Sequence, residues 1–335
     1  MPIPLLFIAA GVGTGLFGVG KSIKAGIDQK EANNTNAAAN YVISRAKENA
    51  NTSRTNCSDS IVNLGKTKID VLDGSIKNFI IEFEKLNHVD FSESEGLLEL
   101  NKFVLDEKSF SELKELQGMA TSLGGGLASG AMAGAITAFG AYGAAGVLAT
   151  ASTGTAIASL SGVAATNATL AFFGGGSLAA GGLGMVGGTA VLGGLVAGPA
   201  LAVLGAVVGA QASKNLDVAN MNWAKAKEYE EELKKTSDLC NGIRRRADMF
   251  SRFLLRLQTV FDPLIYDMSK IIKSKGTDFR TFSEDERKCV ASAMSLAGAV
   301  KAILDTPILD SDGNLTKESG TAIKEVQKKV ESINV

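Results

Sequence analysis

Residues 116–213 contain no Asp, Glu, Lys, Arg or His, and this uncharged block opens with LQGMATSLGGGLASGAMAGAITAFGAYGAAG (residues 116–146). The block holds 24 of the chain's 38 glycines, and much of the remainder is Ala, Leu, Val and small Ser or Thr. A helix of about 20 apolar residues crosses a bilayer once. A water-exposed core of 98 residues would carry charges on its outer faces. The block is therefore predicted to be membrane-embedded, or to be a membrane-competent element that is shielded inside a soluble form.

The flanks of the block have an ordinary, highly charged composition. All 34 Lys and Arg and all 35 Asp and Glu lie in them, and the net charge is −1. A basic stripe is absent, so we expect no nucleic-acid partner. Cys57, Cys240 and Cys289 are far apart and lack CxxC spacing, which indicates neither a disulfide framework nor a zinc site. The single histidine is His88 and no catalytic constellation is visible, so we predict no catalytic residue, no metal ligand, no cofactor and no enzyme activity.

The organisation along the chain follows from these composition changes. The N-terminal segment is apolar up to Lys21, and its basic residues follow the apolar run, so it does not resemble a cleavable signal peptide. We expect synthesis in the cytoplasm and association with a membrane, while solubility before insertion and export by another route stay open. The predicted parts are an apolar N-terminal segment (1–21), a helical stalk in two parts (22–117 and 214–275), a glycine-rich membrane-insertion domain (118–213) and a C-terminal helical region (276–335).

The two stalk parts carry apolar residues at alternating spacings of three and four, which is the heptad pattern of paired helices. The residues expected to pack along these stripes are Ile69, Leu72, Ile76, Phe79 and Phe83 in the first part, and Phe250, Leu254, Leu257 and Phe261 in the second. Residues 22–87 are predicted to form one helix that Gly65 and Gly74 bend or break, and Pro263 is predicted to kink or end the second helix. An antiparallel stalk with the block at its tip is the simplest arrangement. The fold class is all-α: an elongated helical bundle with a hydrophobic insertion domain.

Three Ser-x-x-Glu patterns predict helix starts with capping boxes, at Ser92, Ser109 and Ser283. The last of them begins a helix of about residues 283–304. A turn is predicted at Asp312-Gly313, followed by a final helix at about 317–333.

Within the block, up to four apolar helices are predicted, the first at about residues 120–149. Glycines at spacings of four form ridges that permit close helix contact, which in lipid replaces the hydrophobic effect as the force that joins helices. The glycines of these ridges are Gly126, Gly130, Gly134, Gly184, Gly188, Gly194, Gly198, Gly205 and Gly209. The alternative of a Gly/Ala-rich hairpin buried inside a soluble helical bundle stays open.

A phosphate-binding motif also matches the sequence. Gly15, Gly20, Lys21 and Ser22 satisfy GxxxxGK[ST], in which the lysine would reach the β- and γ-phosphates and the serine would hold Mg²⁺. The rest of a P-loop domain is missing, because the chain shows no alternation of strands and helices and no Walker B strand. We interpret the match as the end of a glycine-spaced apolar helix.

The block contains AATNATLAFFGGGSLAAGGLGM (residues 164–185) and LGGLVAGP (residues 192–199). These segments resemble a family of uncharacterised bacterial glycine-zipper proteins that pair such a centre with flanking coiled-coil helices. The resemblance covers most of the chain and implies no established activity. The architecture is also similar to α-helical pore-forming toxins of the cytolysin A and haemolysin BL type, and to the apolipoprotein L family, in which a hydrophobic hairpin accompanies long helices.

These patterns predict a membrane-inserting helical protein that permeabilises a bilayer, with the lipid bilayer and further copies of the chain as partners. A separate partner subunit stays open. One alternative is a membrane scaffold or lipid-binding protein that opens no pore. A second alternative is a nucleotide-dependent membrane remodeller that uses residues 15–22.

Overall fold

The computed structural model describes residues 20–91, 105–124, 133–143, 216–310 and 314–331. These residues form helices and no strand. Their β-type hydrogen bonding is limited to two isolated bridges, which join Asn87 with Asp278 and Leu309 with Leu315. The prediction of an all-α fold built on long heptad helices is confirmed. None of the helices within these ranges combines the length and the apolarity needed to cross a membrane.

The chain divides into two compact units, and two long helices, α1 (Gly20–Val71) and α9 (Leu216–Lys275), contribute to both. The first unit comprises Met1–Glu48 and Ala202–Leu233. The side chains that α1 and α9 bury here are mostly small: Ala32, Ala39, Ala46, Ala219 and Ala226. The Asn222 amide Nδ2 donates a hydrogen bond of 3.0 Å to Asn36 Oδ1 across the pair. Such small side chains let two helix backbones approach closely.

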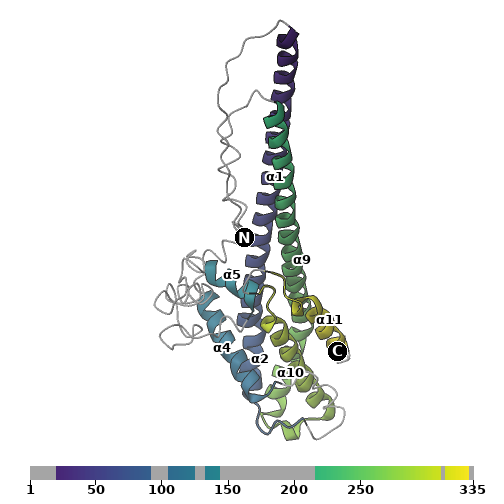
Figure 1. Cartoon of the computed structure of the whole chain (residues 1–335). Helices are drawn as coiled ribbons and strands as arrows, with labels where there is room; N and C mark the ends of the chain where they lie inside the picture. The colour runs from purple at the N-terminus through teal and green to yellow at the C-terminus, as the bar shows by residue number, and fades with distance from the viewer. Residues whose placement is uncertain (1–19, 92–104, 125–132, 144–215, 311–313, 332–335) are drawn as a thin grey trace. The chain divides into compact units, whose positions relative to one another are not determined.

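The second unit comprises Asn49–Leu201 and Lys234–Val335. Its α1 and α9 segments lie side by side (Figure 1) and run in the same direction. Cys57 meets Cys240, and further along the chain Phe79, in the helical continuation of α1, meets Phe261 with ring centroids 5.5 Å apart. The prediction of an antiparallel stalk is therefore wrong. A heptad stripe faces a partner equally well in either direction, so the sequence pattern alone leaves the direction open.

The apolar seam between these two helix segments contains the stripe residues predicted from the sequence. Eight of the nine are buried, and Phe83 is partly buried against the same core. Phe79 also stacks on Phe83 at 5.3 Å. The seam is the main core of the second unit.

Gly74 and Pro263 leave both helices continuous. Gly74 lies in a π-helical turn, η1 (Leu72–Ile76), after which the helix continues as α2 (Lys77–Phe83). A π-turn absorbs an extra residue without ending the helix. Pro263 lies inside α9 on its exposed face, so water can satisfy the carbonyl that proline leaves without an N–H partner. A break at Gly65 or Gly74 and an end at Pro263 are therefore wrong, because the helical backbone continues through all three residues, while a bend or kink there stays a prediction.

Four further helices pack in the second unit (Figure 1): α4 (Glu107–Gly124), α5 (Ala133–Tyr142), α10 (Glu284–Asp305) and α11 (Glu318–Glu331). The predicted helix at 120–149 overlaps the end of α4 and the whole of α5, and residues 125–132 and 144–149 lie outside the described residues.

The helix starts test two of the predicted caps. Ser283 and Glu286 form the predicted capping box of α10. In contrast, α4 is capped by Asp106, whose Oδ1 accepts a 2.7 Å hydrogen bond from the Ser109 amide, so the predicted cap at Ser109 is wrong. The aspartate comes one turn earlier and is an equally good cap residue. The cap at Ser92 and the turn at Asp312-Gly313 lie outside the described residues, although Leu309 and Leu315 pair on either side of that turn.

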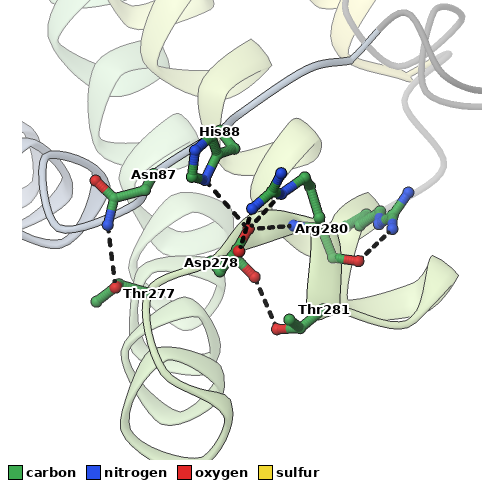
Figure 2. Close-up of polar contacts among 7 residues, drawn as sticks. Asn87, His88, Thr277, Asp278, Arg280 and Thr281 are labelled. Carbon is green, nitrogen blue, oxygen red and sulfur yellow. Dashed lines mark hydrogen bonds and ion pairs between the residues drawn. The ribbon is translucent and has the colours of Figure 1, made fainter.

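The end of α9 is joined to the segment after α2 by polar contacts (Figure 2). Asn87 Nδ2 donates to Thr277 Oγ1 at 3.1 Å, and His88 Nδ1 lies 3.4 Å from Asp278 Oδ1. Asp278 also accepts hydrogen bonds from Arg280 and caps η5 (Phe279–Thr281), and these bonds hold the pKa of its carboxyl well below the ordinary range. These contacts fasten the junction that leads into α10.

Candidate functional site

Among the described helices, α5 alone lies wholly within the uncharged block, and it is packed against charged helices of the second unit rather than isolated. Ile136, Phe139, Ala141 and Tyr142 are buried. Figure 1 shows α5 beside α1. The surface that receives α5 is the candidate functional site. We call it the α5 dock and define it by Gly65, Lys68, Asp305, Ile308 and Leu309.

The first contact of the α5 dock is between two backbones. A Cβ atom placed on Gly65 would lie 2.1 Å from the Ile136 carbonyl oxygen, and one placed on Gly140 would lie 2.2 Å from the Ile61 carbonyl oxygen. Cβ atoms do not approach other atoms this closely, so glycine is required on both helices. The crossing of α1 and α5 is therefore a glycine-to-glycine contact of the kind that joins helices in membranes.

The second contact is a fully buried lysine. Lys68 follows Gly65 by one helical turn, and its Nζ donates a 3.0 Å hydrogen bond to the Phe139 carbonyl oxygen. The same Nζ lies 5.1 Å from the centroid of the Phe139 ring, which is a cation–π distance. Burial lowers the pKa of Lys68 to about 7, and the nearby Asp305 carboxylate opposes this shift. Near neutral pH the amine thus changes its charge inside the dock.

The charged groups around Lys68 come from α10 and α4. Lys301 Nζ lies 2.6 Å from Asp305 Oδ2 and 2.9 Å from Glu112 Oε2. Burial raises the pKa of Asp305, while its bond with Lys301 counteracts the rise. Because Lys301 already pairs with both carboxylates, Lys68 depends on a neutral carbonyl and an aromatic ring for its direct contacts.

The third contact fixes the C-terminal end of α5. The Ala141 carbonyl accepts hydrogen bonds from the amides of Ile308 at 2.8 Å and Leu309 at 3.0 Å. Gly143 ends the helix with a φ of +70°, the left-handed conformation that glycine adopts most readily. A Cβ at this position would lie 2.8 Å from the Asp305 carbonyl oxygen. The chain leaving α5 is therefore held against the end of α10.

This arrangement holds an apolar helix against α1 and the end of α10. Within the described ranges no group of three or more His, Cys, Asp or Glu side chains is placed to hold a metal ion. The helix is fixed by backbone contact and by one amine whose charged form is disfavoured by burial. A change in the charge of that amine alters how firmly α5 is held.

The structure places few of the sequence-predicted glycines. Gly134 lies in α5, whereas the other eight glycines of the predicted ridges lie outside the described residues. For the P-loop match, Gly20, Lys21 and Ser22 form the first turn of α1, and Gly15 lies outside the described part. The described residues contain no strand that could support a P-loop.

Sequence reasoning missed Lys68 and the partner of Gly65. The available signal was the position of Lys68 on the apolar stripe of α1, seven residues after Ile61 and four after Leu64, where a hydrophobic residue is expected. A lysine in such a stripe indicates a specific buried contact or an interruption of the core.

Comparisons with protein families, with curated proteins and with solved structures gave no match to this chain. The resemblance to glycine-zipper proteins and to helical toxins therefore stays a prediction.

Replacing Gly65 with alanine is expected to push α5 away from α1, because the new methyl group would overlap the Ile136 carbonyl. We expect a loss of about 1–3 kcal/mol in the free energy of unfolding, together with faster hydrogen exchange at residues 133–142. The matched control is Gly118→Ala on exposed α4, where nothing lies within 4 Å of the added atom. Urea unfolding and hydrogen-exchange mass spectrometry test this. Equal stability of the two variants would contradict the close crossing.

Replacing Lys68 with methionine is expected to flatten the pH dependence of stability. In the folded chain Lys68 loses its proton near pH 7, and in the unfolded chain it keeps it up to about 10.5. Unfolding therefore takes up a proton in this interval, so raising the pH stabilises the wild type by about 1.4 kcal/mol per pH unit through this group. The variant lacks this contribution. The exposed Lys66→Met serves as the control, and urea unfolding between pH 7 and pH 10 measures the difference. Parallel curves for Lys68→Met and wild type would contradict the burial of this amine.

Proposed function

We propose that this protein inserts its uncharged block into a lipid bilayer and permeabilises it as a homo-oligomer, after release of the block from the α5 dock. The observation that carries the proposal is the packing of α5, a helix of that block, against α1 and α10 through two glycines and a buried lysine. A segment of 98 uncharged residues needs a low-polarity environment, and the dock supplies one for part of it.

The energetic argument compares two surroundings for α5. In the dock, α5 buries Ile136 and Phe139 but forces Lys68 into an apolar site. In a bilayer, the same apolar side chains are again removed from water, and Lys68 regains its hydration on the protein that stays outside. Insertion therefore keeps the apolar burial of α5 and relieves the desolvation of Lys68.

The block also carries glycine ridges that suit association in lipid. Gly126, Gly130 and Gly134 recur at spacings of four, and helices in a bilayer join through such small residues. The contact of Gly140 with Gly65 is a contact of the same type within one chain. We infer that exchange of this contact for contacts between copies drives assembly.

Dye release from liposomes, with flotation of the same sample, tests the proposal. We expect the wild type to float with vesicles and to release the dye, because the block inserts and assembles. Gly130→Asp places a charge in the ridge and is expected to abolish release while helical content stays unchanged. Gly320→Asp on the exposed first turn of α11, outside the uncharged block, is the matched control and should retain release.

The other outcomes identify the competing functions. Flotation without dye release supports a membrane scaffold and contradicts permeabilisation. Release that requires a nucleoside triphosphate and is lost in Lys21→Ala supports a nucleotide-dependent remodeller. Equal release by Gly130→Asp and wild type would show that the glycine ridge is not used.

A further inference from the structure

The seam between α1 and α9 contains a charged side chain at a position where an apolar one is expected. Ala50, Arg54, Cys57, Ile61 and Leu64 follow the heptad spacing along α1, and all five are buried. Arg54 is only 3% exposed. A guanidinium at such a depth is strongly disfavoured unless an anion or hydrogen-bond acceptors compensate it.

Two of the three nitrogens of this guanidinium have no hydrogen-bond acceptor. Arg54 Nε and Nη2 are buried and make no hydrogen bond. On the facing helix, Arg244 Nε is also buried without a partner, although Arg244 Nη1 lies 3.7 Å from Asp248 Oδ2. Two arginine side chains thus bring unpaired donors to one level of the seam. This level is suited to a buried negative charge.

Two thiols lie at the same level. Cys57 follows Arg54 by three residues on α1, and Cys240 precedes Arg244 by four on α9, so each cysteine shares a helix face with an arginine. Both thiols are free and 3% exposed, and they are neighbours across the two helices. The seam therefore brings together a pair of thiols that are 183 positions apart, the difference between 57 and 240.

The surroundings make the two thiols unequal. The hydrogen bond from Cys57, with the nearby charge of Arg54, lowers the pKa of Cys240 to about 7. The same hydrogen bond and burial raise the pKa of Cys57 well above its ordinary value. The third cysteine, Cys289, has no arginine acting on it, and burial raises its pKa to about 11. A thiolate beside a cation attacks oxidants, whereas a neutral buried thiol does not.

We propose that Cys57 and Cys240 form a peroxide-reactive dithiol that closes to a disulfide between α1 and α9. In the first step the Cys240 thiolate attacks one oxygen of hydrogen peroxide, the O–O bond breaks, hydroxide leaves, and Cys240 becomes a sulfenic acid. In the second step the Cys57 sulfur attacks the Cys240 sulfur, the S–O bond breaks, and the hydroxyl leaves as water with the Cys57 proton. The hydroxide takes up the proton first lost by Cys240, so two thiols and one peroxide yield one disulfide and two waters.

Arg54 is the positioning residue of this chemistry. Its guanidinium stabilises the Cys240 thiolate before the attack, and the thiolate in turn compensates the buried charge. Arg244 acts in the same way on the Cys57 side, because its charge favours ionisation of Cys57. The product ties two parallel helices together at one level of their seam. This inference is independent of the proposed membrane activity.

The test treats the purified full-length chain with hydrogen peroxide at pH 7, followed by blocking of free thiols in denaturant and peptide mapping by mass spectrometry. We expect the number of free thiols to fall from three to one, with a Cys57–Cys240 linkage, a loss of two hydrogens in mass, and full reversal by dithiothreitol. Cys289→Ser should behave like wild type, and Cys240→Ser should form no intramolecular linkage. Three unchanged thiols, a linkage through Cys289, or irreversible oxidation of Cys240 would overturn the proposal.

A second measurement tests Arg54. Arg54→Met is expected to slow disulfide formation at least tenfold at pH 7, because the Cys240 thiolate loses its neighbouring cation. Arg54→Lys keeps a cation and should restore most of the rate. Circular dichroism of both variants verifies that the helices are intact, and the rate of wild type between pH 6 and pH 9 shows the titration of Cys240. A rate that is equal in Arg54→Met and wild type would remove Arg54 from the mechanism.

Discussion

The apolar seam between α1 and α9 is the constraint on which the second unit depends. Its aromatic contact at Phe79 and Phe261 and its thiol contact at Cys57 and Cys240 fix the two helices in one direction and register. Further along α1 than Cys57, Gly65 and Lys68 receive α5. The thiol pair and the α5 dock thus both depend on residues that α1 buries.

Helix α1 buries two cationic side chains, Lys68 and Arg54, and the cost of burying each charge is offset in a different way. Lys68 is compensated by a carbonyl and an aromatic ring, and it can become neutral, as its lowered pKa shows. Arg54 presents a guanidinium, whose burial calls for a nearby anion or hydrogen-bond acceptors. The Cys240 thiolate is suited to that role. At both positions, a cationic side chain is buried among apolar ones. The helix contact at Lys68 therefore depends on protonation, and we infer that the contact at Arg54 depends on the state of the nearby thiols.

Sequence patterns predicted the elements better than their pairing. The heptad stripes, the capping box at Ser283 and the all-α class follow from spacings within a few turns, and the structure contains them. The same reasoning predicted a bend or break at Gly74 and a kink or end at Pro263, where a π-turn and an exposed helix face keep the helix continuous. It also treated the cysteines as unrelated, because 183 residues of separation between Cys57 and Cys240 carry no local signal.

The uncharged block, its glycine spacing and the helical character of its flanks are properties of the amino-acid sequence alone, since composition and periodicity are local. The parallel direction of α1 and α9, the crossing of Gly65 with Gly140, the burial of Lys68 and the meeting of Cys57 with Cys240 arise only in the tertiary structure. The physical reason is that a helix stripe specifies that a partner is needed, while packing of side chains from distant segments selects which partner fits.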